Sequence, residues 1–145
     1  MADMTSDERS TWLSAGVAIL SFGIYVALLL ARWEGGPVAA AAYAVPMLGT
    51  IGGGIVAIIA GNIFLGVRFR EECGKRDVRD LEIGRLGAYV GQWFVVFGSI
   101  TALVLCLLRV EHFWIANTVY LGFILSAVLE SATKIVAYRH GLPPC

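Results

Sequence analysis

Charged residues are scarce in this chain. Only 15% of its 145 residues are charged, against about 25% in typical soluble domains, whereas 58% are hydrophobic. The formal net charge is zero, so the sequence lacks the basic surface that nucleic-acid binding requires. The mean hydropathy of +0.76 indicates a membrane protein, and a chain of this length corresponds to one domain. We therefore expect a single transmembrane domain over residues 1–145 that binds no nucleic acid.

Cysteine and the common catalytic motifs are also rare or missing. The three cysteines, Cys73, Cys106 and Cys145, have no C-x-x-C spacing, and their odd number does not indicate a disulfide framework or a zinc site. The sequence contains no H-E-x-x-H, no G-x-S-x-G and no phosphate-binding glycine loop. We therefore expect no enzymatic activity, no catalytic residue, no metal site and no cofactor.

Four apolar stretches are each long enough to cross a membrane as a helix, which takes about 20 residues. They are continuously apolar and do not alternate as barrel strands do, so we expect helices. The first stretch exceeds the apolar region of a signal peptide and is expected to be retained. The predicted helices cover residues 12–31, 38–67, 86–108 and 113–138.

The connections between these stretches differ in length. Residues 32–37 and 109–112 are short turns, whereas residues 68–85 form a polar linker with six basic and five acidic residues. Short turns make the helices that they join antiparallel. The predicted fold class is all-α, a polytopic membrane protein with four transmembrane helices arranged as two antiparallel hairpins.

Basic residues are distributed unevenly along the chain. Nine of the eleven lie in the N-terminus, the linker and the C-terminal end, and only Arg32 and Arg109 lie in the short turns. By the positive-inside rule, both termini and the linker are cytoplasmic. We therefore expect a multi-pass protein of the inner or plasma membrane that has the lipid bilayer as a partner.

The second apolar stretch carries small residues at a spacing of four. Such a face allows two helix backbones to approach closely in lipid. Three interpretations remain open, namely packing within the chain, a contact in a homo-oligomer, or a broken helix that lines a solute path. The predicted helix-packing residues are Gly49, Gly53, Ala57 and Gly61.

Glu130 and Lys134 lie in the fourth stretch, with the acid four residues before the base, which favours an ion pair on a helix. Ionisable residues inside a membrane are functional candidates. Asn62 and Gln92 reach the same inner-leaflet level, so we expect these four side chains to form a polar cluster. The cluster is either a structural clasp or a proton, ion or solute site open to the cytoplasm. Asn117 cannot share the helix face of Glu130.

The linker carries charges of both signs, unlike a polybasic lipid-binding segment. We expect the second and third helices to extend into it, with a break at Gly74. It is either a solvated helical hairpin or a docking surface for a cytoplasmic protein. The candidate partner-binding residues are Arg76, Asp77, Arg79, Asp80 and Glu82.

Three segments carry a resemblance to a known family. Arg76–Ile83 (RDVRDLEI), His112–Asn117 (HFWIAN) and Lys134–Gly141 (KIVAYRHG) are similar to segments of small bacterial four-helix membrane proteins of uncharacterised activity. The resemblance covers about the C-terminal half of the chain. Members of such families look like neighbours of small helix-turn-helix regulators, so the resemblance implies a sensory or regulatory setting. It directs attention to Asn117, Glu130 and the linker.

These observations favour a non-enzymatic scaffold or regulatory membrane protein that acts through its cytoplasmic linker. The alternative is a homo-oligomeric transporter or channel for a small solute or an ion, with Glu130 as its coupling or selectivity group. A dry, paired Glu130 favours the first function, and a water-accessible Glu130 favours the second.

Overall fold

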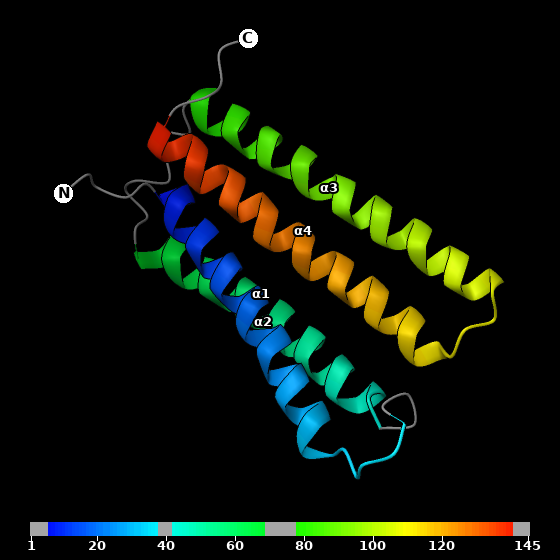
Figure 1. The fold of residues 1–145 in the computed structure, drawn as a ribbon. Coiled ribbons are helices and arrows are strands. Elements are labelled where there is room, and N and C mark those ends of the chain that lie inside the picture. Colours follow the sequence, from blue (N-terminus) through cyan, green and yellow to red (C-terminus); the bar gives the residue numbers. More distant parts are fainter. Residues whose placement is uncertain (1–5, 38–41, 69–77, 141–145) are drawn as a thin grey trace.

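The computed structural model describes residues 6–37, 42–68 and 78–140, which form four α-helices and no strand (Figure 1). Each helix is long and apolar enough to cross a membrane. The predicted all-α class with four helices of membrane-spanning length is confirmed. The helices are α1 (Ser6–Ala31), α2 (Ala44–Arg68), α3 (Val78–Leu107) and α4 (His112–His140).

Three helices extend beyond the predicted apolar spans at the end that carries the charges. α1 begins at Ser6 and α3 at Val78, six and eight residues before the predicted starts at 12 and 86, and α4 continues to His140. At 1.5 Å per residue, α3 is about 45 Å long, which exceeds a hydrocarbon core of about 30 Å. The excess length consists of polar turns. By contrast, α2 begins at Ala44, later than the predicted start at 38.

The helices pack in the order α2, α1, α4, α3 (Figure 1). α1 lies between α2 and α4, and the contact between α3 and α4 is the most extensive. α2 and α3 form no comparably extensive contact within the described part of the chain, so they are the outer helices of the bundle. The start of α1, the end of α2, the start of α3 and the end of α4 all lie at the same end of the molecule (Figure 1).

Few side chains are buried, and one cluster of buried side chains lies toward the end of the molecule that holds the two short turns. Large apolar side chains elsewhere point outward, for example Val67, Phe97 and Leu107, which are 74%, 73% and 75% exposed. An apolar surface of this extent is unusual for a soluble monomer and indicates contact with lipid or protein. The core cluster consists of Tyr25, Leu29, Met47, Phe113 and Tyr120.

The turn between α3 and α4 is closed by a Schellman motif. The Val110 N–H donates to the Leu105 carbonyl at 3.1 Å, and the Arg109 N–H donates to the Cys106 carbonyl at 3.0 Å. Arg109 adopts a φ of 55°, a left-handed conformation that glycine usually occupies at this position. These bonds satisfy the last carbonyls of α3 and reverse the chain, so that α4 begins at His112.

Hydroxyl groups within the helices donate back to the carbonyl four residues earlier. These bonds satisfy the hydroxyl groups within the helix itself and allow serine and threonine to lie in apolar helices. The pairs are Ser14 with Ser10, Thr50 with Pro46, Ser99 with Val95, Thr101 with Phe97, Thr118 with Trp114, and Thr133 with Leu129.

Candidate functional site

Glu130 and Lys134 form an ion pair on α4. The Lys134 Nζ donates to the Glu130 Oε1 at 2.6 Å. The Lys134 side chain is 24% exposed and the Glu130 side chain is 35% exposed. They pack over glycines of α3. A Cβ added at Gly87 would lie 2.7 Å from the Lys134 Cγ, and a Cβ added at Gly91 would lie 3.1 Å from the Glu130 Cβ. The two glycines therefore make room for the ion pair at the α3–α4 interface.

Asn62 and Gln92 do not join this pair. Asn62 lies on α2, and its Oδ1 accepts a hydrogen bond from the Ser10 Oγ of α1 at 2.5 Å. Gln92 is exposed on α3. The expectation of one cluster of four side chains is therefore wrong. Equal depth along the helices does not bring these side chains together, because α1 lies between α2 and α4.

The backbones of α3 and α4 approach each other closely. A Cβ added at Gly98 would lie 3.1 Å from the Cα of Gly122, and a Cβ added at Gly91 would lie 3.0 Å from the Ser126 Oγ. The sequence carries a readable signal for this interface, which the predicted helix-packing residues do not include. Small residues that are buried in the structure recur along α3 at spacings of four, seven and four, namely Gly87, Gly91, Gly98 and Ala102.

The predicted small-residue stripe on α2 is mostly unpacked. A Cβ added at Gly49 or Gly53 would meet no atom within 4 Å, and Ala57 is exposed. Gly61 is the member of the stripe that packs closely against α1, together with Gly54, which lies outside the stripe. The interpretation as packing within the chain is therefore wrong for Gly49 and Gly53. The line of contact with α1 runs along the neighbouring helix face.

Gly49, Gly53 and Ala57 instead line an apolar groove of about 330 Å³ between α2 and α1. Val17 and Leu20 belong to its α1 wall. Lipid chains or a second copy of the protein fit such a surface equally well, so a contact in a homo-oligomer stays a prediction.

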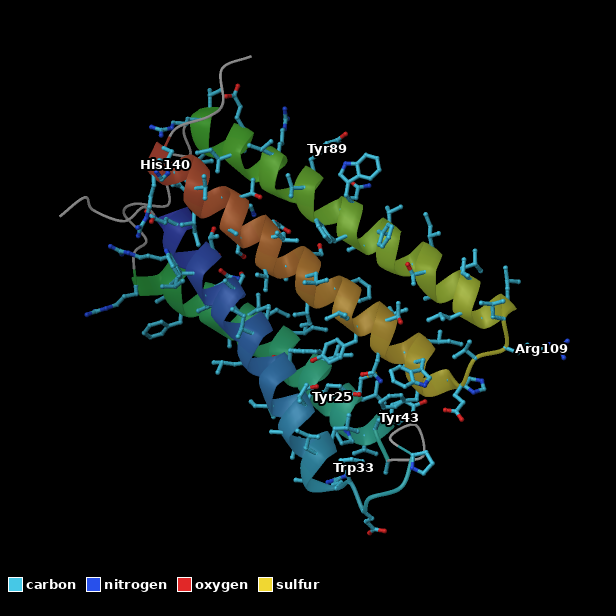
Figure 2. The ribbon with its side chains drawn as sticks, viewed as in Figure 1. Tyr25, Trp33, Tyr43, Tyr89, Arg109 and His140 are labelled. Carbon is cyan, nitrogen blue, oxygen red and sulfur yellow. The ribbon has the colours of Figure 1, made fainter. Side chains whose placement is uncertain are left out.

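A hydrogen-bonded aromatic cluster links α1, α4 and α2. Its Tyr25 is labelled in Figure 2. The Tyr25 hydroxyl donates to the Asn117 Oδ1 at 2.8 Å, and the Asn117 Nδ2 donates to the Phe113 carbonyl at 2.8 Å. The Tyr120 hydroxyl donates to the Thr50 Oγ1 at 3.2 Å. Tyr25 is only 1% exposed. Asn117 therefore acts as a structural link, with a partner 92 residues away that periodicity could not identify.

A polar cavity of about 360 Å³ lies at the charged end of the molecule, among α1, α3 and α4. We call it the interfacial cavity. Since α4 packs between α1 and α3, its residues form the floor and the other two helices form the walls. The polar residues that line it are Ser10, Thr11, Asp80, Arg85, Lys134 and Tyr138.

The candidate partner-binding residues fall into two groups. Arg79 and Glu82 are exposed on the first turns of α3, and Asp80 is half-buried beside the interfacial cavity. Arg76 and Asp77 lie outside the described residues, as do Gly74 and its expected helix break.

In the described part of the chain, no three His, Cys, Asp or Glu side chains are placed to hold a metal ion. His140 and the turn at Arg109 lie at opposite ends of α4 (Figure 2). Comparison with known proteins gives no match to a protein-family model, a curated protein or a solved structure. The resemblance to small bacterial membrane proteins stays a prediction.

Proposed function

We propose that the chain is a multi-pass protein of the inner or plasma membrane that scaffolds or regulates a cytoplasmic protein without enzymatic activity. Its helices form two antiparallel transmembrane hairpins, and both termini and the linker of residues 68–85 face the cytoplasm. The partner binds the linker and the charged first turns of α3.

The exposed side chains support insertion in a membrane. Apolar residues cover the outward faces of all four helices. Trp12, Tyr89 and Trp93 are exposed where the polar turns give way to apolar helix. Aromatic rings favour this level because it corresponds to the boundary between lipid and water. Tyr89 points away from the other helices (Figure 2).

The scaffold function rests chiefly on the free charges at the start of α3. Arg79 and Glu82 are exposed and form no hydrogen bond or ion pair with another described residue. They precede the apolar segment, so they project beyond the hydrocarbon core and are available to a partner. Glu130 is instead satisfied by Lys134, which supports a structural role for it over the alternative transport role.

Site-specific crosslinking in cells tests the proposed function. A photoreactive amino acid at Arg79 or Glu82 should give a discrete adduct with another protein, because both side chains lie on the proposed contact. The same photoreactive amino acid in place of Glu111, which lies in the turn at the other end of the molecule, is the matched control. The adduct is identified by mass spectrometry, and its purified partner should bind the purified chain.

Charge reversal then examines the specificity of the contact. Arg79→Glu together with Glu82→Lys should abolish the adduct while the protein stays in the membrane. An adduct that persists in the reversed variant, or one that forms equally well from position 111, would contradict the scaffold function.

Cysteine accessibility tests the proposed topology. In a chain whose native cysteines are replaced, Glu82→Cys should resist a membrane-impermeant thiol reagent in intact cells and react after lysis. Glu111→Cys should react in intact cells, because its turn faces the other side by the positive-inside rule. The reverse pattern would overturn the orientation.

A further inference from the structure

The interfacial cavity lies at the height of lipid headgroups. Its α3 wall contains Asp80 and Arg85, after which the apolar part of α3 begins. The exposed ring of Tyr89 follows within one turn and packs edge-on with Trp93, at a centroid distance of 6.2 Å. Such rings favour the boundary between headgroups and hydrocarbon. A phospholipid beside α3 would therefore have its headgroup at the level of the cavity.

The cavity presents one unmatched charge of each sign. Lys134 also lines it, but its ammonium group is matched by Glu130 at 2.6 Å. Arg85 and Asp80 form no hydrogen bond or ion pair with another residue in the described part of the chain. Arg85 is exposed and Asp80 is half-buried, so both charged groups are accessible to a ligand. A ligand that carries both a cation and an anion would satisfy both side chains.

We propose that the interfacial cavity binds the zwitterionic headgroup of an ethanolamine-type phospholipid, with its phosphate on Arg85 and its ammonium on Asp80. The planar guanidinium of arginine binds phosphate oxygens in a bidentate manner. The primary ammonium donates N–H bonds to the carboxylate, which a choline headgroup cannot do because its nitrogen carries no hydrogen.

The shape and composition of the cavity fit this ligand. Its volume of about 360 Å³ falls within the range of about 300–1,000 Å³ that small-molecule sites occupy. Gly84 leaves the α3 wall open, since a Cβ added there would meet no atom within 4 Å. An anionic lipid without an amine carries no cation to pair with the Asp80 carboxylate, which disfavours it. The site depends on membrane insertion but not on the proposed protein partner.

Lipid binding to the purified, delipidated protein tests this site directly. Native mass spectrometry in detergent compares phosphatidylethanolamine, phosphatidylcholine and phosphatidylglycerol, with soluble glycerophosphoethanolamine as a separate arm. The ethanolamine lipid should bind about tenfold more tightly than the choline lipid, because one charge-assisted hydrogen bond separates them. The soluble headgroup should bind more weakly than the lipid, since it lacks the acyl chains that pack on the apolar helix surface.

Variants assign the binding to the cavity. Asp80→Asn should reduce the preference for ethanolamine over choline, because the amide oxygen still accepts a hydrogen bond but carries no charge. Arg85→Gln should weaken binding of all three phospholipids by about tenfold. Arg79→Gln is the matched control, because Arg79 lies on the same helix but does not line the cavity. Gly84→Leu should fill the cavity and block binding. Gly23→Leu is its control, because a Cβ there also meets open space, away from the cavity.

Three outcomes would overturn the proposal. The first is equal binding of the three phospholipids to the unaltered protein. The second is that Asp80→Asn, Arg85→Gln and Gly84→Leu bind the lipids as their control variants do, while circular dichroism shows that all variants are folded. The third is binding of the soluble headgroup as tightly as the lipid, which would assign the cavity to a soluble phosphate ester.

Discussion

Replacement of Gly98 by leucine should force α3 away from α4 and lower the free energy of unfolding by about 3 kcal/mol, the upper part of the usual cost of overpacking. A Cβ at Gly98 would already lie 3.1 Å from the backbone Cα of Gly122. A backbone atom cannot move aside as the end of a flexible side chain can, and the remaining leucine atoms add to the clash. Equilibrium unfolding in mixed detergent micelles measures the loss.

Gly53→Leu is the matched control for this prediction. Both substitutions exchange glycine for leucine inside a helix, so both gain similar helix propensity, but Gly53 faces open space. Its stability as a monomer should be unchanged or slightly higher. If Gly98→Leu is as stable as this control, the close α3–α4 contact is wrong. If Gly53→Leu instead dissociates an oligomer, the groove between α1 and α2 is a contact between copies.

Glu130→Gln should lower the free energy of unfolding by about 1.5–3 kcal/mol, the usual value of a hydrogen bond to a charged group. The substitution leaves the Lys134 ammonium, whose aliphatic stem packs over Gly87, without its carboxylate partner. The loss should be smaller than the roughly 3–5 kcal/mol of a fully buried pair, because Lys134 can extend toward the headgroups. Thermal and denaturant unfolding of the purified protein report the change.

A double-mutant cycle separates the ion pair from other effects of the substitution. Lys134→Met keeps the aliphatic stem over Gly87 and removes the charge, so the double variant should recover part of the stability lost in Glu130→Gln. A proton-flux assay in vesicles runs alongside. A Glu130→Gln protein of unchanged stability that loses a pH-dependent flux would favour the transport function over the structural one.

Local features of the site were predictable, but the partners across helices were not. The four-residue spacing of Glu130 and Lys134 is a property of one helix, and the structure contains their ion pair. Depth in the membrane alone predicts that Asn62 and Gln92 join them, but depth does not give the direction in which each side chain points. The glycines of α3 carried a signal as readable as that of Gly49 and Gly53, yet spacing cannot distinguish a stripe that meets a helix from one that does not.

The sequence by itself determined the number of helices, their approximate bounds and the separation of charged ends from apolar segments. These properties follow from hydropathy and chain length, because a span of apolar residues must satisfy its backbone hydrogen bonds internally. The tertiary structure alone decided the helix order α2–α1–α4–α3, the glycine contact of α3 with α4 and the link from Tyr25 to Asn117. All four helices offer apolar faces of similar character, and lipid competes with protein for each of them. Which faces meet is therefore set by close packing and by hydrogen bonds between distant residues, and the spacing of small residues along one helix does not identify the helix that it meets.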